Sequence, residues 1–249
     1  MNKAKISLII ILASFFTITF YLYQTTRRVV VFCDVGQGAA TLFQMGSEQV
    51  LIDTGPDGRV LSCLGRYMPL FDKTIEVIII SHDQRDHDGA LPLILNKYTV
   101  KNIFGPALAK QPKTNSRFSE IKAQYSFRFD TCLFSIRKSS QSSDKNESAN
   151  IVSVFSSSNV YFISSDISAL ELYRLMPRET TVFEVPHHGS KYGLSPLSLS
   201  LAHPTLAVIS VGKNNVYGHP STQALAVLKA KKIPFMRTDV RGDIVLPLK

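Results

Sequence analysis

The sequence is poor in cysteine and lacks internal repeats. Its cysteines, Cys33, Cys63 and Cys132, lie far apart and form no C-x-x-C pair. Neither a zinc ribbon nor a disulfide framework is therefore indicated, and we expect three small buried apolar residues. No repeat of about 20–50 residues is visible, which argues against a solenoid or a propeller. At 249 residues the chain is long enough for one large domain with a substantial core.

Acidic residues are also scarce, since 28 Lys and Arg face 19 Asp and Glu, for a formal net charge of +9. Such an excess favours polyanionic partners: nucleic acid, anionic lipid or phosphorylated wall polymers. Residues 101–145 carry nine Lys and Arg against three acids, so this basic segment holds most of the excess. Within it, residues 110–128 are polar with weak periodicity and predict irregular structure, and residues 139–148 predict an exposed loop.

No charge interrupts the apolar stretch over residues 6–23. At a rise of about 1.5 Å per residue, a helix of this length nearly spans a bilayer core of roughly 30 Å. A signal peptide is the alternative, although the stretch is long for one and no A-x-A site follows. A buried core helix is disfavoured because the stretch is apolar all round. We expect residues 1–28 to form an uncleaved single-pass membrane anchor, with the following domain outside the cytoplasm.

The rest of the chain, residues 29–249, alternates short β-type runs with amphipathic segments. A fully apolar strand is predicted over residues 76–80, and helices are predicted over residues 196–202 and 222–231. Clusters of strands with helices between them predict two sheets covered by helices, an αββα sandwich of the α/β (α+β) class.

The most informative stretch is His82-Asp83-Gln84-Arg85-Asp86-His87, which directly follows the apolar strand. A loop at a strand end can direct imidazole and carboxylate groups at one point, and this ligand set suits a zinc- or manganese-type ion. A polar helix start with Asp as its N-cap is the alternative interpretation. Scattered surface histidines would not repeatedly follow strands, yet most of the six histidines do. We therefore expect a shared metal site among these strand-end histidines: His82, His87, His187, His188 and His219.

The order of motifs DVGQG, LIDTG, H-x-x-x-D-H, S-D, PHHGS and SVGKNN-x-YGHP resembles the metallo-β-lactamase fold. It is most similar to the C-terminal hydrolase domain of the ComEC competence proteins, a DNA-uptake channel family. The resemblance covers roughly residues 29–248. ComEC chains normally also contain a multi-helix channel domain, whereas this chain has one apolar segment. The chain thus resembles a stand-alone or split hydrolase part, which implies a separate channel subunit.

The resemblance implies roles for the matched residues. The implied ligands of one or two divalent ions, Zn or Mn, are His82, Asp86, His87, Asp166 and His188. The implied catalytic residues are Asp86, His187 and His219. Supporting roles beside the ligands fall to Asp34, Asp53 and Gln84, and substrate contacts fall to Lys191, Lys213 and Tyr217.

Four positions depart from the pattern of the family. Gln84 stands where the family usually has His or Asp, and Ala39 replaces the Asp of GQGDA. Ser165 and Ala90 replace glycines. An amide oxygen carries no charge and binds zinc-type ions less well than a carboxylate, so one metal position is expected to be weakened.

The function implied is that of a membrane-anchored, metal-dependent phosphodiesterase or nuclease. It would act without sequence preference on single-stranded DNA during competence-type uptake. One alternative is a catalytically degenerate DNA-binding module of a split uptake channel. Another is a phosphoesterase with a non-DNA substrate, such as a wall polymer or a choline ester, because fold does not decide substrate.

Overall fold

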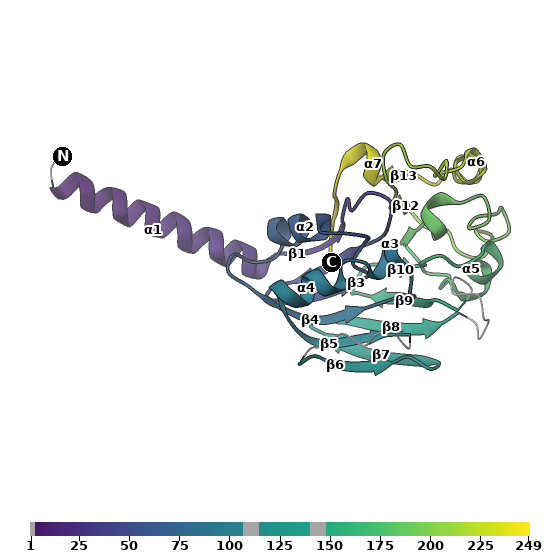
Figure 1. Ribbon diagram of the computed structural model, residues 1–249. Helices are drawn as coiled ribbons and strands as arrows, with labels where there is room; N and C mark the ends of the chain where they lie inside the picture. The colour runs from purple at the N-terminus through teal and green to yellow at the C-terminus, as the bar shows by residue number, and fades with distance from the viewer. Residues whose placement is uncertain (1–2, 107–114, 140–147) are drawn as a thin grey trace.

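The computed structural model describes residues 3–106, 115–139 and 148–249, and within them two seven-stranded sheets face each other (Figure 1). The first sheet has the order β14 (Ile244–Pro247), β1 (Arg28–Phe32), β2 (Thr41–Met45), β3 (Glu48–Ile52), β4 (Thr74–Ile79), β5 (Thr99–Gly105), β6 (Arg117–Glu120). The second has the order β13 (Phe235–Arg237), β12 (Leu206–Ile209), β11 (Val182–Glu184), β10 (Val160–Ile163), β9 (Asn150–Phe155), β8 (Cys132–Lys138), β7 (Gln124–Phe129). The predicted two-sheet sandwich is confirmed.

Helices cover the outer faces of both sheets. The helices are α1 (Lys3–Thr26), α2 (Arg59–Tyr67), α3 (Arg85–Asp88), α4 (Leu91–Lys97), α5 (Ala169–Leu175), the 3-10 helix η1 (Pro186–Gly189), α6 (Thr222–Ala230) and α7 (Thr238–Arg241). Buried side chains of α2 and α4 pack on the first sheet, and those of α5 and α6 pack on the second.

Alternating side chains of the strands build the core. In β1, Val30 and Phe32 point between the sheets, whereas Val29 and Val31 point toward the helices. Since successive side chains of a strand face opposite sides of the sheet, an apolar run with both faces covered is buried throughout. The same holds for β4, the strand that leads into the histidine-rich loop.

Two expectations about local structure are wrong. In the described part of residues 110–128, strands β6 and β7 form instead of irregular structure, pairing with β5 and β8. These edge strands expose many polar side chains, so their sequences lack the alternation of apolar and polar residues that indicates a strand. The helix expected over residues 196–202 is absent as well. Ser195 and Ser198 each accept a hydrogen bond from the other's backbone N–H, and the turn that they close is not continued as a helix.

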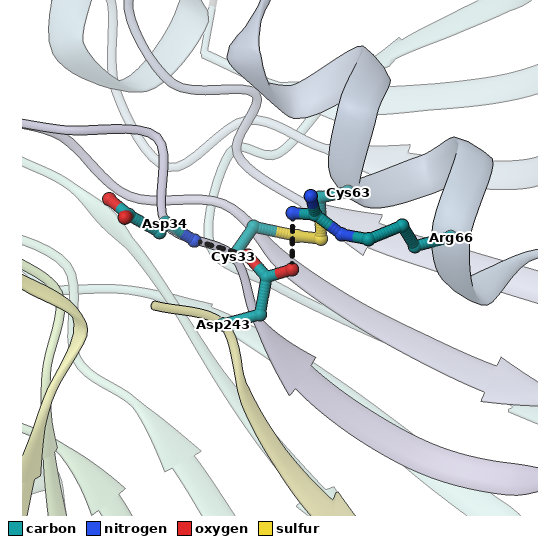
Figure 2. The surroundings of a disulfide bond; sticks show 5 residues. All are labelled: Cys33, Asp34, Cys63, Arg66 and Asp243. Atoms are coloured by element: carbon teal, nitrogen blue, oxygen red, sulfur yellow. Dashed lines mark hydrogen bonds and ion pairs between the residues drawn. A yellow bond between two sulfur atoms is a disulfide. The ribbon is translucent and has the colours of Figure 1, made fainter. Parts of the chain in front are cut away.

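The expectation about the cysteines is wrong for two of the three. Cys33 follows β1 and Cys63 lies in α2, and the two form a disulfide with a Cα–Cα distance of 5.9 Å (Figure 2). Cys132 is free and buried, as expected. The two cysteines are 30 residues apart in sequence, so no short spacing motif predicts their pairing. The packing of α2 against the first sheet brings the two side chains together.

Helix α1 extends away from the sandwich (Figure 1), and its described apolar side chains are exposed. Across the described ranges, we find no helix whose length and apolar character suffice to cross a bilayer. The anchor over residues 1–28 therefore stays a prediction, as does the domain boundary that follows it.

Candidate metal centre

The parallel strands of the two sheets deliver the candidate ligands to one edge of the sandwich. β3 and β4 run parallel, with Ile52 opposite Ile79, and β10, β11 and β12 run parallel in the other sheet. Asp53 therefore lies beside the histidine loop that follows β4, and Asp166 lies beside the histidine pair that follows β11. A hydrogen bond from Asn150 N–H to the Ser81 carbonyl, 2.8 Å long, joins the two sheets at this edge.

Four of the predicted ligands form a tight group. One ligand atom from each of Asp86, His87, Asp166 and His188 lies within 4.8 Å of the others. His87 Nε2 is 3.2 Å from Asp166 Oδ1, and His188 Nε2 is 3.3 Å from Asp86 Oδ2. His82 Nε2 lies 3.9 Å from Asp166 Oδ2. The structure thus brings together all five side chains that the sequence singled out as ligands.

The donor set fits a divalent cation. His82 is buried, and its Nε2 atom has no hydrogen-bond partner within the described parts of the chain. Leaving a buried polar atom without a partner costs about 1–3 kcal/mol, which a coordinated ion would remove. Imidazole nitrogens combined with carboxylate oxygens are the donors that zinc- and manganese-type ions take in proteins.

Asp53 orients His87 toward this group. Its Oδ2 lies 2.7 Å from His87 Nδ1, and its two oxygens accept hydrogen bonds from Ser81 N–H and Ser81 Oγ at 2.7 Å each. With Nδ1 held in this way, Nε2 faces Asp166. His188 is held similarly, because its Nδ1 lies 2.8 Å from the Ser210 carbonyl. Such outer contacts fix ring orientation and tautomer in metal sites.

Four residues at the site adopt left-handed backbone conformations that non-glycine residues rarely use. Asp53 has φ 58°, Ser165 has φ 52°, and the adjacent His187 and His188 have φ 52° and 54°. Each such residue costs roughly 1–3 kcal/mol and persists only where the surroundings hold it, which is typical of functional sites. Ser165 stands where the resemblance places a glycine, and its positive φ explains that preference.

The charges of the site are strongly coupled. Burial opposes the charge on His87, but Asp166 and Asp53 outweigh it and hold the His87 pKa well above its usual value. Burial likewise opposes the charge on Asp166, yet His87 and His188 hold the Asp166 pKa below its usual range. Burial lowers the pKa of His82 to about 4, and the neighbouring charge of His87 adds to this shift. His82 is thus a neutral donor, ready to coordinate without losing a proton.

A cavity of about 310 Å³ opens over the cluster. The predicted catalytic residues Asp86, His187 and His219 line it, together with Gln84 and Tyr217. The Tyr217 ring stacks on His219 with centroids 5.9 Å apart and is 67% exposed, so its free face is open to a ligand. The His187 and His219 rings lie 6.0 Å apart.

Three predicted residues lie apart from this cavity. Lys191 is positioned over the Tyr192 ring at 4.9 Å, and Lys213 is exposed, but neither lines the cavity. Asp34 accepts a hydrogen bond from Gly36 N–H and lines a second cavity, so it supports no ligand of the cluster directly.

Sequence reasoning missed several residues at the site. Arg85 and Gln37 line the cavity. Ser81 Oγ lies 2.9 Å from His82 Nδ1, and the Ser210 carbonyl contacts His188. Glu184 lies beneath the cluster, buried, and accepts a hydrogen bond from Ser210 Oγ. Its one sequence signal is an acidic residue inside an apolar strand. Burial raises the Glu184 pKa to about 7.

Comparison with curated proteins finds related sequences, although no family model matches the chain. The chain is 26% identical to Recombination protein 2 of Haemophilus influenzae over 98% of its own length and 32% of the relative. It is 25% identical to ComE operon protein 3 of Bacillus subtilis over 69% of its length and 24% of the relative. For Competence protein ComA of Neisseria gonorrhoeae the identity is 23%, over 95% of this chain and 34% of that protein. The chain therefore spans about a third or less of these relatives.

Solved structures share the fold. The metallo-β-lactamase fold protein YhfI from Bacillus subtilis superposes with a TM-score of 0.63 at 14% identity, covering 88% of this chain and 99% of that one. The short form of human tRNase Z superposes with a TM-score of 0.55 at 13% identity, covering 88% and 99%. The chain has the metallo-β-lactamase fold and homologues among competence proteins.

Proposed function

We propose that this chain is a metal-dependent hydrolase that cleaves phosphodiester bonds of single-stranded DNA during DNA uptake. The observation that carries the proposal is the convergence of His82, His87, His188, Asp86 and Asp166 beneath an open cavity. The similarity to competence proteins supports the choice of DNA, and the net charge of +9 supports a polyanionic substrate.

In this proposal the three imidazoles and two carboxylates hold one or two divalent ions. A bound ion would supply Lewis acidity and would lower the pKa of a coordinated water toward about 7. Asp86 lines the cavity and is partly exposed, and its proposed role is to orient the attacking water. His187 and His219 line the cavity and would donate hydrogen bonds to phosphoryl oxygens. Tyr217 would offer its exposed ring for stacking of an unpaired base.

A second candidate function is a DNA-binding module with weak or no catalysis. Gln84 lines the cavity at a position where a carboxylate or imidazole would bind an ion more tightly. The Ala39 side chain likewise has no atom that can bind a metal ion. Its backbone N–H donates a hydrogen bond to the Asp86 carbonyl at 3.1 Å. Both features favour loss of one of two metal positions.

The proposed location is outside the cytoplasm, attached to a membrane through residues 6–23. The Cys33–Cys63 disulfide supports the extracytoplasmic part, because such bonds persist in oxidising compartments and are rare in the cytosol. A separate channel subunit as partner belongs to the same proposal.

The test measures metal content and cleavage of a fluorescent single-stranded oligonucleotide with the full chain. Asp166→Asn and His82→Ala are expected to lose bound metal and cleavage while retaining DNA binding. His203→Ala, an exposed histidine away from the cluster, serves as the matched control and is expected to change neither.

Other outcomes separate the alternatives. Salt-sensitive DNA binding by the wild type with no cleavage at any metal loading favours the binding module. Hydrolysis of a small phosphoester without any DNA binding overturns DNA as substrate and favours the non-DNA phosphoesterase. Neutralising the exposed Arg117, Lys122 and Arg128 tests whether the basic segment contributes, by flattening the salt dependence of binding.

A further inference from the structure

A second polar cavity, of about 500 Å³, is lined by Asp34, and Gln37 of the same loop lines the metal cavity. Helix α2 supplies Arg59, Ser62, Arg66 and Tyr67 to its wall, and the segment after α7 supplies Gly242 and Asp243. Arg241, the last residue of α7, completes it. The Cys33–Cys63 disulfide fastens α2 to the segment that follows β1, near Arg66 and Asp243 (Figure 2).

Three guanidinium groups line the cavity, and their partners leave donors available. Asp57 pairs with Arg59 at 2.8 Å, yet the Arg59 side chain remains 54% exposed. Asp243 pairs with Arg66, whose side chain remains 55% exposed. Each guanidinium has five N–H donors, so one carboxylate does not exhaust it.

Arg241 differs from the other two. It is exposed, and nothing in the described ranges forms an ion pair with its guanidinium. The Asp34 carboxylate, also at this cavity, points away from Arg66 (Figure 2) and accepts a hydrogen bond from Gly36 N–H. The cavity therefore presents one unpaired cation and two half-exposed ones to a ligand.

The loop after β1 separates this arginine cavity from the metal cavity. Gln37 lines the metal cavity, Asp34 lines the arginine cavity, and Gly36 stands between them. The Arg59 guanidinium packs against Gly36, where a Cβ would come within 2.0 Å of it. On the metal side, Arg85 lines the cavity and its charge lowers the Asp57 pKa, after the larger effect of Arg59. Cationic groups thus continue from one cavity to the other across a single loop.

We propose that the arginine cavity binds a backbone phosphate of the same strand whose scissile phosphate lies at the metal centre. Guanidinium groups match the bidentate geometry of phosphate. Such a second phosphate site would make the substrate a polymer, since one phosphate group cannot occupy two cavities that share no lining residue. The inference rests on the proposed function and names its substrate class: an oligonucleotide of several phosphates.

The test uses the full chain loaded with metal and oligonucleotides with phosphorothioate linkages, so that binding is measured with cleavage suppressed. Arg241→Gln is compared with wild type for anisotropy-detected binding of a labelled thymidine octanucleotide and a labelled thymidine dinucleotide. Octanucleotide affinity is expected to fall about fivefold, with the log–log salt slope smaller by about 0.7, the value for one phosphate contact. Dinucleotide affinity is expected to stay unchanged, because its single phosphate occupies the metal centre.

Arg178→Gln is the matched control. Arg178 is exposed and precedes the first residue of β11, whereas the candidate ligand His188 follows the last residue of that strand. The same loss of charge at Arg178 is therefore expected to leave both affinities unchanged. Thermal unfolding of each variant verifies that folding is intact.

The failure of this inference is distinguishable from failure of the proposed function. If wild type binds the octanucleotide and Arg241→Gln binds it equally well with the same salt slope, the arginine cavity is not a phosphate site. Equal losses of octanucleotide affinity in Arg241→Gln and Arg178→Gln overturn the inference too. The loss would then follow from the lower net charge of the protein and not from the arginine cavity. If wild type binds no octanucleotide, the proposed function itself fails.

Discussion

The Nδ1 atom of His87 lies 2.7 Å from Oδ2 of Asp53, a residue 34 positions earlier that directly follows strand β3. This pair turns the opposite ring nitrogen of His87 toward Asp166, 3.2 Å away. Asp53 thereby determines how His87, a candidate ligand in helix α3, faces the candidate metal centre. Ser81 donates a hydrogen bond to each carboxylate oxygen of Asp53. These bonds hold Asp53 in its left-handed backbone conformation.

Asp53→Asn is expected to weaken metal binding about 10–100-fold while leaving the fold intact, because an amide no longer enforces the tautomer of His87. Competition with a chromophoric chelator measures the affinity. Asp34→Asn is the control, since Asp34 lines the arginine cavity instead. Equal affinities for Asp53→Asn and wild type would contradict the role given to Asp53.

Gln84→Asp and Gln84→His are expected to raise the number of ions bound per chain, and activity with it, because each adds a donor that zinc-type ions prefer. Elemental analysis of the dialysed protein gives the stoichiometry. Gln37→Glu adds charge to the same cavity from a different loop and is expected to have no such effect. Unchanged metal content in both Gln84 variants would contradict the claim that Gln84 weakens one metal position.

The buried Glu184 predicts a pH-dependent stability in metal-free protein. Its pKa is about 7 in the folded state, raised by burial from 4.5. The folded state therefore binds the proton more tightly than the unfolded state, so this contribution is fully present below pH 4.5 and is lost as pH rises through about 7. The difference corresponds to roughly 3 kcal/mol of unfolding free energy.

Glu184→Gln removes that titration. In EDTA, the variant is expected to match wild type near pH 4.5 and to exceed its stability near pH 8, as measured by urea unfolding at both values. Parallel stability curves for the two proteins across this range would refute the prediction.

The disulfide closes a loop of about 30 residues, so removing it is expected to cost about 3.6 kcal/mol of unfolding free energy. Dithiothreitol should destabilise wild type by this amount and leave the double variant Cys33→Ala/Cys63→Ala unaffected. Cys132 remains in both proteins, which controls for effects of the reductant on the free thiol. A reductant effect of the same size in both would exclude the disulfide as its cause.

The sequence by itself determined the layered fold and the candidate ligands, because short stretches of consecutive residues indicate both. An apolar run such as residues 76–80 predicts a buried strand, and a loop of histidine and aspartate directly after it predicts where the polar side chains lie. Parallel strands end at one edge of a sheet, so strand-end residues from distant motifs meet there.

Only the tertiary structure decided the relationships between segments that carry no local signal. Cys33 and Cys63 became partners because α2 packs over the end of β1, and Glu184 acquired its environment because β11 is central in its sheet. The arginine cavity likewise combines α2 with the segment after α7, more than 170 positions apart along the chain, as in the Arg66–Asp243 pair. Chain spacing fixes which side chains share a strand or helix, whereas the packing of elements from distant parts of the sequence fixes which side chains touch.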